Sequence, residues 1–336
     1  IISLVAARFA LKRFPSAKVS KSFSNVPHFR IATASRPHMN FPVQALEGFK
    51  HELAKRSHIF TAQVDDFFAD NQLTMQAMLN EAVDAGYDLI LPIGAAFTQL
   101  AHAITTRRKS KIPVVFAGVL SPASSLGVLQ DDAHPDGNIT GVSFDNIPSD
   151  TLVEAIMSLK PHMKRVLLPW STSGNGGRMG EQIKKARPIL EKRGIIVEEV
   201  VIEAVGEVVK KIQPFMKRID SMIIFPGSLI SEAVVGLIKL CDQHNVTLAT
   251  FELGSVSKGA AIGWGGYSDE IGAAAVDFVE KILVDGVSPQ QLPVKCMDDW
   301  VRLAVNMEAM DKQDLQLTSA QLFCLRSGML IQKTVR

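Results

Sequence analysis

The sequence has little cysteine, with three residues of this type in a chain of 336. They are Cys241, Cys296 and Cys324, which lie far apart and form no CxxC or Cys/His spacing. Zinc sites and disulfide-stabilised domains need cysteines at closer, paired spacings. The sequence therefore predicts neither a zinc site nor a disulfide framework, and we expect the three thiols to be inert packing residues.

Common catalytic motifs are absent as well. The chain has no GxSxG, no HExxH and no P-loop, and its eight histidines show no metal-ligand spacing. Gly263–Gly266 resembles a dinucleotide-binding loop, but Ser268 stands where the third glycine of that motif belongs. We therefore expect a protein that is not an enzyme and that binds no cofactor and no metal.

An excess of charge of one sign is missing, and so are long apolar runs. The formal net charge is +2, whereas a nucleic-acid surface needs a concentrated basic face. No apolar run reaches the roughly 18 residues that a membrane-spanning helix needs. We therefore expect no nucleic-acid partner and no membrane span.

The first residues are more apolar than the rest of the chain. Ile1–Leu11 is apolar apart from Ser3 and Arg8, and Lys12 and Arg13 follow it. Secretory signals place their positive charges before the apolar core and end in a small-residue cleavage site, which is not evident here. Two interpretations stay open, the remnant of a secretory segment and a frayed amphipathic arm.

The stretch Asp88–Pro122 has the pattern of a strand, a helix and a second strand. Leu89–Ile93 is a short apolar run that ends at a glycine, and Thr98–Arg108 places apolar residues at helical spacing. Ile112–Val119 is a second apolar run, rich in valine. Two buried strands joined by a helix predict a parallel βαβ unit. Ligands of parallel sheets bind beyond the carboxyl ends of the strands, such as Gly94–Phe97.

Strand and helix patterns alternate in this way in two series, with a break near residues 145–150. A single core rarely grows beyond about 250–300 residues, so this chain is expected to form two lobes. The predicted fold class is α/β, with two doubly wound, Rossmann-like lobes. Each lobe has strand-end loops rich in Gly, Ser and Pro, and two such rows facing each other would form a cleft.

Helix N-termini that follow small residues are candidate anion sites. Ala95-Ala96 and Gly227-Ser228 occupy such positions, where free backbone N–H groups can bind a carboxylate or a phosphate. Ser228 and Ser173 have an alternative role, because serine is a preferred cap of its own helix.

Acidic and aromatic residues also stand at strand ends. Asp145 and Glu252 are candidates for binding a ligand ammonium, with solvated or lobe-bridging carboxylates as the alternative. Aromatic residues make up 7% of the chain, so their presence at strand ends or turns suggests ligand contact, with ordinary packing as the alternative for each. The aromatic residues at these positions are Phe97, Phe144, Trp170, Phe251, Trp264 and Tyr267.

Eight sequence blocks follow one another in a specific order over roughly residues 28–315. They are DLILPIGAAFTQLA (88–101), IPVVFAGVLSP (112–122), GNITGVS (137–143), RVLLPWSTSGN (165–175), DSMIIFPGSLIS (220–231), KGAAIGWGGYSDEIGAAA (258–275), DGVSPQQLPV (285–294) and VRLAVNMEAM (301–310). In these blocks the chain resembles the tryptophan/tyrosine-type family of ABC-transporter substrate-binding proteins, which has the type I periplasmic-binding-protein fold.

The resemblance implies two lobes joined by three crossovers, with a small ligand held between them. By analogy, the first lobe comprises 28–146 and 268–290, and the second comprises 147–267 and 291–315. Residues 1–27 would then be a leader or arm, and 316–336 a tail. The implied hinges lie near 144–148, 267–269 and 288–293.

The family's ligand contacts can be carried over to this chain position by position. They fall on Ser35, Ala95, Ala96, Phe97, Gln99, Ser143, Ser173, Asn175, Ser228, Glu252 and Tyr267. The loop after the first strand departs from the family pattern, because many relatives have H-P-x-L-D where this chain has Ser35-Arg36-Pro37-His38-Met39. Arg36 would either offer a fixed cation for a ligand carboxylate or be solvated.

The function implied by the resemblance is that of an extracytoplasmic solute-binding protein of an ABC importer. Such a protein binds an amino acid or related molecule by Venus-flytrap closure and delivers it to a membrane permease. A monomer in the periplasm or another extracytoplasmic place is expected, with a signal or lipoprotein leader as an anchor. The alternatives are the sensor module of a regulator, which needs a helix-turn-helix that residues 1–27 do not provide, and an enzyme on the same fold.

Overall fold

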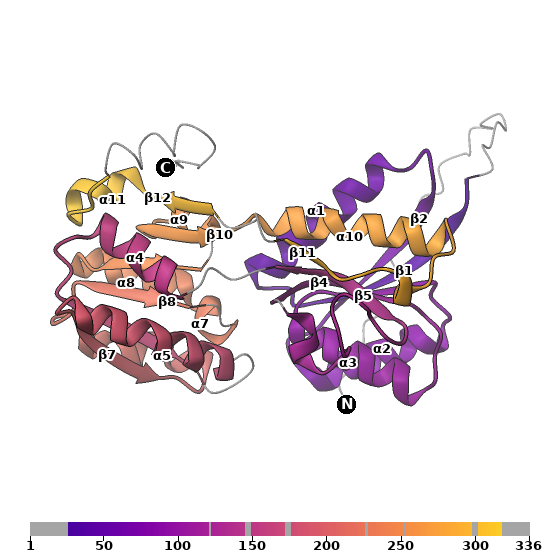
Figure 1. The fold of residues 1–336 in the computed structure, drawn as a ribbon, viewed down its shortest axis with the longest axis horizontal. Coiled ribbons are helices and arrows are strands. Elements are labelled where there is room, and N and C mark those ends of the chain that lie inside the picture. Colours follow the sequence, from indigo (N-terminus) through magenta and orange to yellow (C-terminus); the bar gives the residue numbers. More distant parts are fainter. Residues whose placement is uncertain are drawn as a thin grey trace, which may run out of the picture.

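The protein has two lobes, each built on one six-stranded sheet with helices around it (Figure 1). The two lobes lie side by side along the longest axis of the molecule, which confirms the α/β, two-lobed fold class predicted from the sequence. The computed structural model describes residues 26–120, 122–144, 149–171, 176–225, 228–251, 253–297 and 302–317.

Lobe 1 contains an all-parallel sheet of strand order β11-β5-β4-β3-β1-β2. Its strands are β1 (His28–Ser35), β2 (Thr61–Phe68), β3 (Leu89–Pro92), β4 (Val114–Leu120), β5 (Ile139–Phe144) and β11 (Lys295–Met297). Its helical segments are α1 (Asn40–Lys55), α2 (Gln72–Asp84), α3 (Ala95–Arg107), η1 (Ala123–Leu126), α10 (Ser268–Leu283) and η4 (Pro289–Gln291).

Alternate residues of the lobe 1 strands enter two different apolar clusters. Ile31 of β1 packs with residues of α1 and α10, whereas its neighbour Ala32 packs with residues of α2 and α3. Successive side chains of a strand point to opposite faces, so one helix pair covers each face. This two-sided burial explains why β3 and β4 are continuous apolar runs without polar alternation.

The βαβ unit expected over Asp88–Pro122 is present as β3, α3 and β4, and the two strands are adjacent in the sheet. The helix begins at Ala95, three residues earlier than the apolar spacing indicated. The difference arises because Gly94 has a φ of 88°, which lets the chain turn directly from the strand into the helix.

Lobe 2 has strand order β12-β10-β9-β8-β6-β7, with only β12 antiparallel to its neighbour. Its strands are β6 (Arg165–Trp170), β7 (Ile196–Val201), β8 (Ser221–Ile224), β9 (Thr247–Thr250), β10 (Ile262–Gly265) and β12 (Arg302–Val305). Its helical segments are α4 (Ser149–Leu159), α5 (Gly176–Lys192), η2 (Val205–Glu207), α6 (Val208–Ile212), η3 (Gln213–Phe215), α7 (Ser228–Glu232), α8 (Val234–His244), α9 (Gly254–Ser257) and α11 (Met307–Lys312). Among the helices in the described ranges, none has the length and apolarity to cross a membrane.

The chain passes between the two lobes three times: after β5, between β10 and α10, and between β11 and β12. The third passage corrects the expected boundary, which assigned all of 291–315 to the second lobe and a hinge to 288–293. Lys295–Met297 pairs in parallel with Val142–Phe144 of β5 and therefore belongs to lobe 1. This pairing covers the backbone groups that β5 would otherwise leave open as an edge strand.

Helices α1 and α10 pack in direct backbone contact. A Cβ atom added to Gly272 of α10 would lie 1.7 Å from the carbonyl oxygen of Ala45 in α1. One added to Gly48 of α1 would lie 2.1 Å from the carbonyl oxygen of Asp269. Only glycine permits this approach, so the helix that returns from lobe 2 is held tightly against lobe 1.

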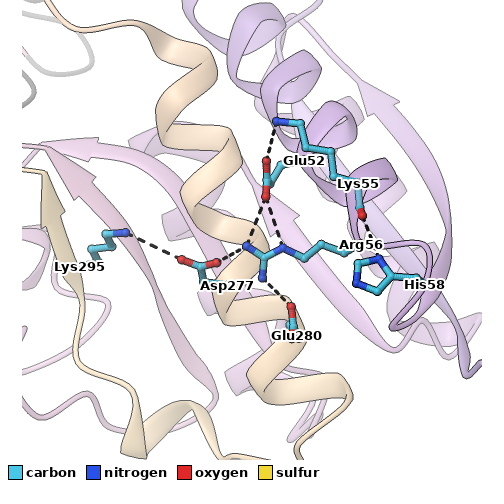
Figure 2. A network of polar contacts seen from close by, with 7 residues as sticks. All are labelled: Glu52, Lys55, Arg56, His58, Asp277, Glu280 and Lys295. Atoms are coloured by element: carbon cyan, nitrogen blue, oxygen red, sulfur yellow. Dashed lines mark hydrogen bonds and ion pairs between the residues drawn. The ribbon is translucent and has the colours of Figure 1, made fainter.

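A charged network holds the other end of the same helix pair (Figure 2). Arg56, which follows α1, donates to Glu280 and Asp277 of α10 over 2.5 Å each and contacts Glu52 at 3.3 Å. Partial burial opposes the charge of Arg56, but the bonds to Glu280 and Asp277 outweigh it and raise the pKa of the guanidinium. Lys295 of β11 lies 3.9 Å from Asp277 and extends the network to the edge strand.

Substitution of Gly272 by alanine is expected to destabilise the fold, because the new methyl group cannot fit without moving α10 away from α1. Overpacking of this kind typically costs about 1–3 kcal/mol. Urea unfolding of the variant followed by circular dichroism measures this loss. Gly206→Ala is the matched control, because a Cβ there meets nothing within 4 Å. Equal unfolding midpoints for the two variants would contradict the close packing.

The buried thiol of Cys241 is expected to resist alkylation in the native protein. Burial raises the pKa of this thiol to about 12, so the reactive thiolate is scarce in mildly alkaline buffer. Cys296 is only half-buried and is the internal control. Peptide mapping by mass spectrometry after a short alkylation should find label on Cys296, with Cys241 labelled only in denaturant. Equal labelling of both in the native state would disprove the expectation, and Cys324 lies outside the described residues.

Candidate ligand-binding site

The carboxyl ends of the strands in the two lobes face each other. Phe144 at the end of β5 stacks on Phe251, which follows β9, with ring centroids 6.1 Å apart. Arg36, which follows β1, bonds through Nη1 to Oε1 of Glu232 at the end of α7, over 2.8 Å. Both contacts join a strand end of lobe 1 to a strand-end segment of lobe 2. The loops that follow the strands of both sheets therefore form the candidate site.

The N-terminus of α3 presents backbone donors at the carboxyl ends of the lobe 1 strands. The amides of Ile93 and Gly94 donate to the carbonyls of Ala34 and Ala117, which places the turn between β1 and β4. No side chain caps the helix, and the first N–H groups of a helix have no partner within it. Ala95 and Ala96 are only half-buried, so their amides, at the positive end of the helix dipole, can bind an anion.

Two serine hydroxyls lie beside this turn without a hydrogen-bond partner among the described residues. Ser35 ends β1 and Ser143 lies in β5, and both side chains are fully buried. A buried hydroxyl without a partner costs about 1–3 kcal/mol. Such a cost is explained if the hydroxyls bind something that the protein alone does not provide.

Two predicted contact residues use their side chains within lobe 1. Phe97 is buried in the core between the sheet and α2 and α3, so only its backbone N–H reaches the helix terminus. Gln99 donates from Nε2 to the carbonyl of Leu126 over 3.0 Å and ties α3 to η1. In this structure both side chains support the loops around the site, and their contact with a ligand stays a prediction.

Tyr267 stands at the passage from β10 to α10. Its ring is half-buried against Leu253 and Ala304, and the guanidinium of Arg302 lies 5.4 Å from the ring centroid. Burial raises the pKa of the phenol, while the nearby Arg302 works in the opposite direction. Arg302 also donates to both carboxylate oxygens of Glu270, at 2.9 and 3.0 Å, so Tyr267 lies next to a bonded ion pair.

A series of aromatic rings runs from lobe 1 into lobe 2 through these strand ends. Phe41 contacts Phe144 with centroids 5.7 Å apart, and Phe144 stacks on Phe251. Phe251 then meets Trp264 at 6.2 Å, and Trp264 meets Phe225 at 6.5 Å. Within this series, the Phe144–Phe251 pair is the aromatic contact that joins lobe 1 to lobe 2.

Sequence reasoning missed two members of this region, Phe41 and Glu232, and only Phe41 had a signal in the sequence. Phe41 lies over Gly118 of β4, where a Cβ would come within 2.3 Å of the ring. A glycine inside a valine-rich strand is the usual sign of such a close approach. Glu232 had no such sign, since its partner Arg36 lies almost two hundred positions away.

Several predicted residues cannot be placed. Ser173, Asn175, Glu252 and Asp145 lie outside the described residues, and so does the side chain of Ser228, the first residue of α7. The roles predicted for them stay predictions. Within the ranges that the structure describes, no group of three or more His, Cys, Asp or Glu side chains is arranged to hold a metal ion.

A cavity of about 320 Å³ lies elsewhere on lobe 1, between the second half of α1 and the start of β2. Its lining is mainly apolar, and its charged group, Lys50, is paired with Asp66. The cavity lies at the amino end of β2, opposite to the carboxyl ends where parallel sheets bind ligands. We therefore do not place the ligand site there.

A protein-family model described as ABC transporter substrate binding protein matches residues 45–324 of this chain. A curated relative described as a tyrosine-binding protein, from Clostridioides difficile (strain R20291), is 25% identical over 259 residues. That alignment covers 77% of this chain and 72% of the relative.

Solved structures with the same architecture include an ABC domain from Streptococcus pneumonia in complex with L-Trp. Its TM-score is 0.77 at 18% identity, covering 88% of this chain and 98% of that one. The ligand-free, open structure of a substrate binding protein with adhesive properties from Clostridium difficile has a TM-score of 0.66 at 22% identity, covering 91% and 100%. At these identities the likeness shows the fold.

Proposed function

The chain belongs to the ABC transporter substrate-binding protein family, and on this basis we propose that it is the extracytoplasmic solute receptor of an ABC importer. The observation that carries the proposal is that the strand-end loops of the two lobes face each other across Phe144–Phe251 and Arg36–Glu232. The proposed ligand site is a cleft between those loops. The family is one of binding proteins, and we propose that this chain catalyses no reaction.

The proposed ligand is an aromatic amino acid or a related small molecule. The name of the tyrosine-binding relative and the L-Trp in the Streptococcus complex support this class. An amino acid also fits the chemistry of the lobe 1 side, because uncapped amides at Ala95 and Ala96 suit a carboxylate. The unpartnered hydroxyls of Ser35 and Ser143 would bind its remaining polar atoms.

Residues of lobe 2 would complete the site. We propose Glu252, or Asp145 from the crossover, as the partner of the ligand ammonium, and Ser173, Asn175 and Ser228 as polar contacts. Tyr267 would contact the ligand from the second crossover, where the ring already lies at the junction of the lobes.

The proposed partner is a membrane permease, with the receptor acting as a monomer. The lobes would comprise 28–146 with 268–297, and 147–267 with 298–315, where the corrected boundary follows from the pairing of β11 with β5. A periplasmic or other extracytoplasmic place, with a leader that anchors the chain, is part of the same proposal.

Substitution of Ala96 by proline should weaken ligand binding while leaving the helix in place, since proline is tolerated in the first turn of a helix. The variant loses one N–H donor to a carboxylate, an interaction of about 1.5–3 kcal/mol, so Kd should rise roughly ten- to hundredfold. Calorimetry with L-tryptophan and L-tyrosine measures the change. Ala96→Ser keeps the N–H and is the matched control. Unchanged affinity of a folded Ala96→Pro protein would remove this helix terminus from the site.

Ligand should also bring the lobes together, because a molecule that touches both rows of loops makes all its contacts only in the closed form. Small-angle scattering should therefore give a smaller radius of gyration at saturating L-tryptophan or L-tyrosine than without ligand. A scattering profile that stays the same while calorimetry shows binding would replace the closure model with a rigid pocket.

A further inference from the structure

Two of the ion pairs formed by the described residues join lobe 1 to lobe 2. One links Arg302, the first residue of β12, to Glu270 in the first turn of α10. The other links Arg36, directly after β1, to Glu232 at the end of α7. The remaining ion pairs of the described part of the chain form within one lobe, so these two pairs respond to the relative position of the lobes.

The two pairs lie at different distances from the crossovers. Glu270 comes three residues after Tyr267, at the second crossover, and Arg302 begins the strand that follows the third. Arg36 follows β1, which β3 and β4 separate from β5, the strand that ends at the first crossover. Three strand spacings correspond to about 14 Å. On the lobe 2 side, Glu232 follows β8, which β9 separates from β10.

When the lobes rotate about their crossovers, the atoms of the two ion pairs separate by different distances. Groups beside the axis move little, so the Arg302–Glu270 pair survives opening. Groups far from the axis move most, and a salt bridge is lost once its atoms separate by more than about 4 Å. The Arg36–Glu232 contact of 2.8 Å is therefore a property of the closed arrangement.

We infer that Arg36 and Glu232 form a charge latch that stabilises the closed form of the protein whether or not ligand is present. The inference rests on the proposed function. It assigns Arg36 a task that differs from direct contact with a ligand carboxylate, because its guanidinium already bonds to an acid from the opposite lobe. Since ligand binds the closed form, the population of that form sets the apparent affinity, and the latch raises it.

The latch should be weak and sensitive to salt. The side chains of Arg36 and Glu232 are 31% and 25% exposed, so the solvent screens their attraction. Pairs with this exposure shift an equilibrium by a few-fold rather than by orders of magnitude. A weak latch biases closure without preventing release of the solute.

The test measures the distance between the lobes in the ligand-free protein at low and high salt, by energy transfer between one fluorophore on each lobe. The wild-type distance should lengthen as salt rises. R36Q and E232Q should show the longer distance already at low salt and respond little to salt. The charge-swapped double variant, R36E with E232R, should restore the short distance. D84N breaks the exposed Arg108–Asp84 pair within lobe 1 and should behave as the wild type.

Binding measurements then separate the latch from a ligand contact. With L-tryptophan as the probe, R36Q and E232Q should both raise Kd about two- to fivefold at low salt. A large loss in R36Q alone, with E232Q unchanged, would make Arg36 a ligand residue and overturn the latch. Wild-type distances and salt response in both single variants would overturn it as well. The distance experiment needs no ligand, so it stands even if L-tryptophan fails to bind.

Discussion

The backbone contact between α1 and α10 is the constraint on which the arrangement of the two lobes depends. Helix α10 follows ten strands in the sequence, and it packs on lobe 1 after the chain returns from lobe 2. Gly48 and Gly272 let the two helices approach until the carbonyl of one would clash with any side chain on the other. The ion pairs of Arg56 with Glu280 and Asp277 hold the far end of the pair, so α10 has one position along α1.

Two segments of the proposed ligand site adjoin this helix pair. Helix α1 starts directly after the Ser35–Met39 loop, and α10 starts directly after Tyr267. Because the two helices are in direct backbone contact, their packing sets the position of the loop after β1 relative to the second crossover. The proposed site would therefore keep its lobe 1 donors in fixed positions on this pair of helices.

The polar groups at the site are left unsatisfied by the fold itself. An uncapped helix N-terminus and two buried hydroxyls without partners among the described residues leave polar groups of lobe 1 available to another molecule. Helix α2, by contrast, has Asn71 as a cap that accepts from the amide of Thr74. Helices α1 and α10 of this lobe lack a side-chain cap as well, so the candidate site at α3 depends on its position beside the buried Ser35 and Ser143 hydroxyls. Around it, the Phe144–Phe251, Arg302–Glu270 and Arg36–Glu232 contacts join the two lobes.

The local sequence determined the buried strands, the strand ends and therefore the edge of each sheet on which a ligand would lie. Continuous apolar runs such as Val114–Val119 report burial on both faces, and Gly94 reports a turn, because these properties depend on neighbours in the chain. Chain length and the two strand–helix series also predicted the two lobes, and the family resemblance added the three crossovers between them. Only the tertiary structure decided that β11 completes the sheet of lobe 1, that the Phe97 side chain is a core residue and that Gln99 holds η1. It alone also brought Glu232 to Arg36 and Glu280 to Arg56. The reason is physical: each of these outcomes is a contact between segments distant in sequence, and periodicity reports which face of an element is buried but not which partner buries it.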